Sequence, residues 1–228
     1  MSTIEAALWP LVLPRTVSRD DRLLLNRSEH ERAARYRFEA DRTAFITGRA
    51  ALRRVLGNQL NTQPWRIEFS RSPCPACASV EHGPPNITSP DTRLSFSFSR
   101  SGDRALVAVN QRGPIGVDLE IDRTNDVDAM ARQCLSLKER AYLDRLPPNH
   151  RQEAFRRAWV RKGAVTKASG IGGSVDLTRV HVIPQEPGRV TVRYRLGRRP
   201  GTWEVSDVDA GPGVTAALAL PNFSIVRF

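Results

Sequence analysis

Cysteine, lysine and long apolar runs are all scarce in this 228-residue sequence. Its three cysteines are an odd number, which argues against a disulfide framework and indicates a reducing compartment such as the cytoplasm. No apolar run reaches the roughly 18 residues that a transmembrane helix needs, so no membrane span is predicted. The N-terminus also lacks a charged segment followed by an apolar core, and we therefore expect no signal peptide.

Lysine accounts for only three of the 35 basic residues, namely Lys138, Lys162 and Lys167, and the others are arginine. The formal net charge of +11 predicts a basic surface that attracts phosphate-bearing or acidic partners. Genomic base composition alone can produce such an excess of arginine. Two of the three lysines nevertheless fall within one short segment, residues 159–167, which reads WVRKGAVTK.

A second segment of interest, residues 115–122, reads IGVDLEID. Its apolar residues alternate with polar ones, which predicts a β-strand with one face in the core. Asp118 and Glu120 are two positions apart and therefore point the same way. Two parallel carboxylates repel each other unless a cation lies between them, and Mg²⁺ prefers such oxygen ligands. The pattern thus predicts a Mg²⁺ site on Asp118 and Glu120, although a solvated edge strand would show the same alternation.

The order of the predicted elements indicates an α+β protein built from two similar halves. Helices followed by strands occur twice, and the joint lies near Gly113-Pro114, so we predict halves at residues 1–113 and 114–228. This order differs from a βαβ series. The segments 1–14 and 71–90 are expected to be an extended lead-in and a loop. The expected helices are 28–36, 40–60, 128–134, 136–145 and 152–168, and the expected strands are 65–70, 94–98, 104–110, 115–121, 177–183, 189–196, 202–208 and 214–220.

Four segments in this order carry a family resemblance. The first is the set Phe38, Arg42, Phe45, Gly48, Arg49, Leu52 and Arg53; FSFSRSGD, PIGVDLE and WVRKGAVTKASGIG follow it. Together they resemble the surfactin-type 4'-phosphopantetheinyl transferases, whose segments read like FNxSHSGD, xGxDxE and WxxKEAxxKxxGxG. The resemblance runs from about Glu29 to the C-terminus.

The resemblance implies a fold of two pseudo-symmetric α+β halves with coenzyme A bound between them. It further implies an enzyme in which Mg²⁺ sits on the xGxDxE carboxylates and the coenzyme A pyrophosphate. A serine of an acyl or peptidyl carrier protein then accepts the phosphopantetheine arm, as in polyketide or peptide biosynthesis. Such phosphoryl transfer depends on positioning and on neutralising charge. We expect a monomer that binds neither nucleic acid, for which no motif is present, nor membrane.

The site residues are carried over from the resemblance position by position. Asp118 and Glu120 match the metal carboxylates. Lys162 and Lys167 match the two helix lysines that act on the phosphates, and the expected coenzyme A contacts include them with Asp118. Further coenzyme A contacts are assigned to Arg32 of the first helix and to Arg71, which follows the strand WRIEFS. The last are Ser99, Arg100 and Ser101, where Arg100 replaces the usual histidine. Each arginine would equally suit a solvated surface.

Gly163 is the main departure from the family pattern, which has glutamate after the first lysine. That glutamate is regarded as a metal ligand and as the general base for the serine. Glycine within a helix costs about 1 kcal/mol relative to alanine, so helix propensity does not explain it. We expect Gly163 to face the carboxylate strand and to leave a gap one side chain deep. Asp122 is the best-placed substitute base, and the alternative is a protein that binds coenzyme A or a carrier without efficient transfer.

The three cysteines and one nearby histidine have other possible roles. Cys74, Cys77 and His82 read CPAC…EHG and could hold zinc, but a structural zinc site needs four ligands and a fourth is not evident. The alternative is a family-specific loop without metal. Cys134 lies on an apolar helical face, and we expect it in the core.

Overall fold

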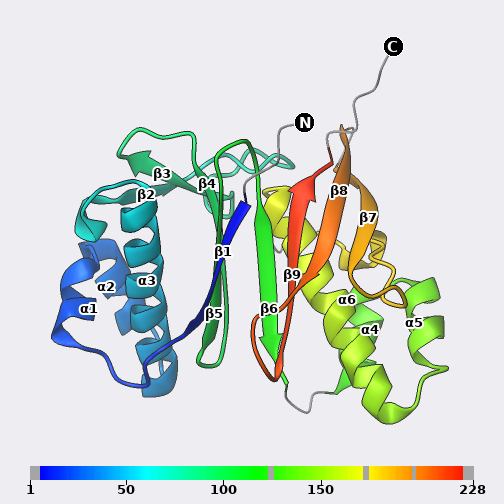
Figure 1. The fold of residues 1–228 in the computed structure, drawn as a ribbon. Coiled ribbons are helices and arrows are strands. Elements are labelled where there is room, and N and C mark those ends of the chain that lie inside the picture. The colour runs from blue at the N-terminus through cyan, green and yellow to red at the C-terminus, as the bar shows by residue number, and fades with distance from the viewer. Residues whose placement is uncertain (1–5, 123–125, 172–174, 197–198, 223–228) are drawn as a thin grey trace.

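The computed structural model describes residues 6–122, 126–171, 175–196 and 199–222. Two sheets lie side by side in its centre, and helices cover them from opposite outer sides (Figure 1). Apolar residues of both sheets form a core between them that includes Leu106, Ala108, Val117 and Leu119. The architecture is α+β, as predicted, and no described helix is both long and apolar enough to cross a bilayer.

The N-terminal sheet has the antiparallel order β1-β5-β4. Its outer face packs against α3, where Leu52 and Leu56 meet Phe96 and Val107. The elements of this half are β1 (Ala6–Val12), α1 (Arg19–Leu24), α2 (Arg27–Ala34), α3 (Glu39–Gln59), η1 (Pro64–Arg66), β2 (Glu68–Arg71), β3 (Pro85–Ser89), β4 (Ser95–Ser101) and β5 (Arg104–Asn110).

The C-terminal sheet has the antiparallel order β6-β9-β8-β7, and α6 packs against it. Ala158, Val165 and Val205 are among the fully buried residues of that core. The elements are β6 (Gly116–Ile121), α4 (Val127–Cys134), α5 (Leu137–Leu143), α6 (Pro148–Ala168), η2 (Leu177–Arg179), β7 (Arg189–Leu196), β8 (Arg199–Val208) and β9 (Val214–Pro221). The predicted division at residue 113 falls between β5 and β6.

A buried ion pair recurs in the two halves and displays their pseudo-symmetry. The long helices α3 and α6 each have 21 residues. Arg53 of α3 bonds Glu29 and the carbonyls of Pro64 and Ile67. Lys162 of α6 likewise bonds Glu139 and the carbonyls of Leu177 and Val180. Both glutamates close a capping box at the start of a short helix.

Four sequence-based predictions of local structure were wrong in part or in whole; the first is the strand expected over 65–70, whose first two residues belong to η1. Part of the predicted lead-in is strand β1, which pairs with β5, while residues 1–5 lie outside the described residues. Pro10 is tolerated there because β1 is an edge strand. The predicted loop 71–90 contains β3, paired with β2. The predicted strand 177–183 is absent, since buried Lys162 and Glu139 bond its backbone groups.

The helix predicted to begin at residue 28 begins earlier, as α2 at Arg27. Asn26, not Ser28, caps the helix, and Glu29 completes the capping box. Asparagine and serine are both good caps, so sequence alone does not choose between them. The start at Asn26 turns Glu29 inward, where it is available to Arg53.

Candidate active site at the junction of the two sheets

Serine side chains of β4 join the two sheets. The hydroxyls of Ser97, Ser99 and Ser101 accept hydrogen bonds from the backbone N–H groups of Val117, Leu119 and Ile121, at 3.0, 3.3 and 3.4 Å. Each serine lies 20 residues before its partner, so β4 and β6 run parallel across the junction. The alternation SFSFSRS places all three hydroxyls on the β6 side.

The same hydroxyls hold the two predicted metal carboxylates. Ser99 Oγ donates to Asp118 Oδ1 at 2.6 Å, and Ser101 Oγ donates to Glu120 Oε1 at 2.5 Å. Each serine therefore accepts from the β6 backbone and donates to a β6 carboxylate. Because the strand and the carboxylates are fixed together, the side chains are positioned before any ligand binds.

Lys167 brings a positive charge to this group from α6. Its Nζ lies 2.7 Å from Asp118 Oδ1 and donates a longer bond, 3.4 Å, to the Phe98 carbonyl. The side chain of Lys167 is one-third exposed, so its ammonium also remains open to solvent. The structure thus brings together five of the predicted residues: Ser99, Ser101, Asp118, Glu120 and Lys167.

Gly163 faces Asp118, as expected, but the predicted gap is not there. A Cβ built on Gly163 would lie 2.6 Å from Asp118 Cγ and 3.0 Å from Asp118 Cβ, and closer still to Oδ2. The Asp118 carboxylate fills the space in which we expected room for a glutamate. Glycine is therefore needed for this close approach of α6 to β6.

Asp122, the substitute base suggested by sequence, directly follows β6 and is paired elsewhere. Its Oδ1 is 3.0 Å from Arg156 Nε on α6. Glu153, on the same helix, pairs with Arg157. Neither carboxylate is hydrogen-bonded to Asp118 or to Lys167 in the described structure.

Lys162 is not part of this group. It is fully buried between α5 and η2, and its Nζ lies 2.8 Å from Glu139 Oε2. Burial lowers the pKa of Lys162, and the Glu139 carboxylate opposes this shift. The two lysines are five positions apart on α6, which turns their side chains about 140° from each other. The structure directs Lys162 into the core and Lys167 to the carboxylates.

We expect Lys162→Met to destabilise the protein by about 3 kcal/mol, because it leaves the buried Glu139 without its cation. For a chain of this size the melting temperature should fall by about 6–12 °C. Lys138→Met is the matched control, since Lys138 is exposed and lies next to Glu139 in sequence. Equal melting temperatures for the two variants, measured by calorimetry, would contradict a structural role for Lys162.

Arginines of the N-terminal half form a second positive group. Arg49 of α3 pairs with Glu29, Nε to Oε1, at 3.2 Å. Burial lowers the pKa of Arg49; Glu29 opposes the shift, and the charges of Arg32, Arg53 and Arg71 add to it. Sequence reasoning included Arg32 and Arg71 but not Arg49. The signal that could have found Arg49 is its place in the GRAALR segment, one helical turn before Arg53.

Arg32 and Arg100 both lie against α3. Arg32 is exposed on α2, with its guanidinium 5.2 Å from the centre of the Phe45 ring. Arg100 lies on the face of β4 opposite to Ser99 and Ser101, where its Cδ approaches Gly48 of α3. The structure therefore does not bring Arg100 to the carboxylate group.

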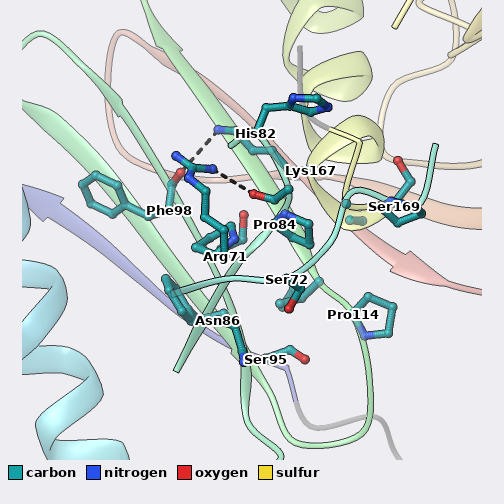
Figure 2. Close-up of a pocket in the computed structure, with 18 of the residues that line it drawn as sticks. Arg71, Ser72, His82, Pro84, Asn86, Ser95, Phe98, Pro114, Lys167 and Ser169 are labelled. Atoms are coloured by element: carbon teal, nitrogen blue, oxygen red, sulfur yellow. Dashed lines mark hydrogen bonds between the residues drawn. The ribbon is translucent and has the colours of Figure 1, made fainter. Parts of the chain in front are cut away.

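A cavity of about 730 Å³ opens between the two halves, next to the carboxylate group. Figure 2 shows side chains from both halves around it, with Arg71 bonded to the Gly83 carbonyl and Lys167 to that of Phe98. A volume of this order is typical of small-molecule and cofactor sites, which enclose about 300–1,000 Å³. Its polar and aromatic lining includes Arg49, Arg71, Ser72, His82, Asn86, Ser95, Ser97, Lys167, Tyr194 and Trp203.

The donor set of β6 suits a hard divalent cation. Asp118 and Glu120 offer carboxylate oxygens on one face, and Ser99 and Ser101 orient them from behind. Mg²⁺ commonly uses one or two carboxylates, with waters and substrate phosphates completing its shell. Lys167 would have to move from Asp118 Oδ1 to make room, and its one-third exposure leaves it free to do so.

Known proteins resemble the chain in both halves. Residues 114–219, which include Asp118, Glu120 and Lys167, match the model of the 4'-phosphopantetheinyl transferase superfamily. The chain is 29% identical over 225 residues to the 4'-phosphopantetheinyl transferase HetI of Nostoc. This alignment covers 96% of the chain and 89% of HetI.

Two further relatives differ in how much they share. The 4'-phosphopantetheinyl transferase AcpT of Escherichia coli K12 is 32% identical over 105 residues, 46% of this chain and 53% of AcpT. The human L-aminoadipate-semialdehyde dehydrogenase-phosphopantetheinyl transferase is 26% identical over 91% of this chain and 72% of its own length. Residues 114–219 thus match the 4'-phosphopantetheinyl transferase superfamily, and the chain resembles its members over nearly its whole length.

Proposed function

We propose that the chain transfers 4'-phosphopantetheine from coenzyme A to a serine of an acyl or peptidyl carrier protein. We further propose the two-half, surfactin-type arrangement, a Mg²⁺ requirement, a cytoplasmic monomer and carriers of polyketide or nonribosomal peptide synthesis. The observation that supports the proposal is the cavity between the halves, which Arg49, Arg71 and Lys167 line, together with the pairing of Lys167 with the anchored carboxylate of Asp118.

The reaction needs positive charge around a pyrophosphate. The serine oxygen of the carrier forms a bond to the phosphorus that bears pantetheine, the pyrophosphate bridge breaks, and 3',5'-adenosine diphosphate leaves. The serine proton passes to a base or to water. Lys167 is the residue of α6 that can neutralise charge on the pyrophosphate, since its ammonium is partly exposed at the cavity.

The arginines supply the second phosphate contact. Arg49 and Arg71 line the cavity, and Arg32 lies close enough for its charge to act on Arg49. Arginine is always charged and binds phosphate through two donors at once. We assign these three residues to the 3'-phosphate of coenzyme A, with Asp118 and Glu120 as ligands of Mg²⁺. When bound, the ion would neutralise pyrophosphate charge.

The decisive experiment is mass spectrometry of a panel of apo carrier proteins after incubation with the chain, coenzyme A and Mg²⁺. A gain of the phosphopantetheine mass on the carrier serine is the expected result. Omission of Mg²⁺ should remove the gain. No gain on any carrier, together with no binding of coenzyme A, would contradict the proposal.

A second candidate function rests on the packing at Gly163. No glutamate lies beside Asp118 at that position, and the room that a glutamate would need is taken by Asp118 itself. A chain that binds coenzyme A or a carrier without efficient transfer would fit this geometry. Tight coenzyme A binding without any mass gain on the carriers would favour this alternative.

A further inference from the structure

A second group of side chains of the kind that bind metals lies in a segment that also lines the cavity. Cys74, Cys77 and His82 belong to the segment between β2 and β3, and their ligand atoms all lie within 4.8 Å of one another. Cys77 Sγ is 3.1 Å from His82 Nε2. Among the described residues, no other group of three or more His, Cys, Asp and Glu gathers in this way.

The backbone of this segment turns back so that the two sulfurs converge. The N–H of Ala78 donates to the Cys74 carbonyl at 2.7 Å, and the N–H of Cys74 donates to Ser79 at 2.8 Å. Ala78 has a φ of 61°, a left-handed backbone conformation that residues other than glycine rarely adopt.

We propose that Cys74, Cys77 and His82 bind one Zn²⁺ ion, with water or another small ligand in the fourth position. A set of two thiolates and one imidazole binds Zn²⁺ in preference to Mg²⁺ or Ca²⁺, which take oxygen ligands. Three protein ligands and one exchangeable position are an established coordination pattern for zinc. Cys77 is exposed and His82 is half-buried, so the ion can enter from solvent.

The ion would fix one wall of the cavity. Ser72, His82, Gly83 and Pro84 line the cavity, and the N–H of Ser72 donates to the Pro84 carbonyl at 2.9 Å. Gly83, which follows the ligand His82, accepts from Arg71 Nη1 at 2.8 Å. Metal on His82 would therefore position Arg71 through the Gly83 carbonyl. The consequence for coenzyme A rests on the proposed function, but the zinc site itself does not.

The test measures metal directly and requires neither coenzyme A nor a carrier. The full chain is stripped with a chelator, reconstituted with Zn²⁺ and analysed for bound metal; a parallel sample receives Co²⁺ and is followed by visible and near-ultraviolet absorption. We expect one zinc ion per chain and a cobalt spectrum with tetrahedral d–d bands and thiolate-to-metal charge transfer. Competition with a chromophoric chelator then gives the affinity.

Matched variants assign the ligands. Cys77→Ser and His82→Asn should each weaken Zn²⁺ binding by about 100-fold or more, since even an indirect disturbance of a zinc site costs 10–100-fold. Cys134→Ala should bind as the parent does, because Cys134 is buried in the core of the C-terminal half. Circular dichroism of each variant shows that the fold is retained, which the exposure of Cys77 favours.

Three results would overturn the proposal. They are the absence of bound metal after reconstitution of the folded parent, an unchanged affinity in both Cys77→Ser and His82→Asn, and a Cys74–Cys77 disulfide that persists under reducing conditions. None of these results bears on transferase activity. Conversely, a chain that binds zinc but modifies no carrier would support the zinc site and contradict only the proposed function.

Discussion

Asp118→Asn is expected to lower the rate of carrier modification by at least about 100-fold, the order seen when one electrostatic group is removed from an active site. The neutral amide keeps the size of the side chain, and Ser99 can still donate to its oxygen. Without its charge, the side chain attracts Mg²⁺ and the ammonium of Lys167 more weakly; that ammonium now lies 2.7 Å from the carboxylate. Rates are measured by mass spectrometry at saturating coenzyme A, and calorimetric titration should show loss of the Mg²⁺-dependent part of binding.

The melting temperature should change little in this variant. The Lys167–Asp118 pair is partly exposed, and such pairs contribute about 1 kcal/mol or less. Asp128→Asn is the control for charge, because Asp128 is exposed and pairs only with Arg151 among the described ion pairs. If Asp118→Asn binds coenzyme A with unchanged Mg²⁺ dependence, the carboxylates of β6 do not hold the ion.

Local patterns predicted the carboxylate strand well because all the information lies in one short segment. The alternation in residues 115–121 fixes which side chains share a face, and β6 confirms this for Asp118 and Glu120. The repeat SFSFSRS follows the same rule and already separates Ser99 and Ser101 from Arg100. The family resemblance assigns all three residues to coenzyme A, although a period of two places Arg100 on the opposite face of the strand.

Lys162 could not be placed from its own segment. Its surroundings come from α5 and η2, which are distant in sequence, and no local pattern states where a lysine side chain ends. A comparison of the two long helices would have helped. Arg53 and Lys162 each occupy the fifteenth position of a 21-residue helix, and both bond a capping-box glutamate. The internal repeat thus identifies Arg53 and Lys162 as cations that stabilise the fold. Lys167 differs from them, because the matching position of the first half carries no basic residue.

Gly163→Ala is expected to destabilise the protein although alanine is the better helix former. The gain in helix propensity is about 1 kcal/mol. The new Cβ would lie 2.6 Å from Asp118 Cγ, so the carboxylate must rotate away from Ser99 and Lys167. Hydrogen bonds to charged groups contribute about 1.5–3 kcal/mol each, less where one partner is exposed as Lys167 is. We expect a net loss of about 1–2 kcal/mol, and a fall in melting temperature of about 2–8 °C.

A double-mutant cycle isolates the cause of that loss. In an Asp118→Ala background the rotating carboxylate is absent, so Gly163→Ala should cost less by about 1 kcal/mol or more. The difference between the two backgrounds is the coupling between positions 163 and 118. A cost for Gly163→Ala that is the same in both backgrounds would show that the contact with Asp118 does not determine the glycine.

Gly163→Glu and Gly163→Gln then test whether a carboxylate at this position can serve the reaction. Both side chains crowd Asp118, so both variants should melt below the parent without Mg²⁺. Mg²⁺ with coenzyme A should recover stability in Gly163→Glu only, because the introduced carboxylate can share the ion with Asp118 and Glu120. If the introduced carboxylate also accepts the serine proton, Gly163→Glu should modify carriers at least about tenfold faster than Gly163→Gln, since general bases contribute about 10²–10⁴-fold.

Equal rates would place the proton acceptor elsewhere, in water or another side chain. If neither variant nor the parent transfers anything while all three bind coenzyme A, the binding protein without efficient transfer becomes the preferred function.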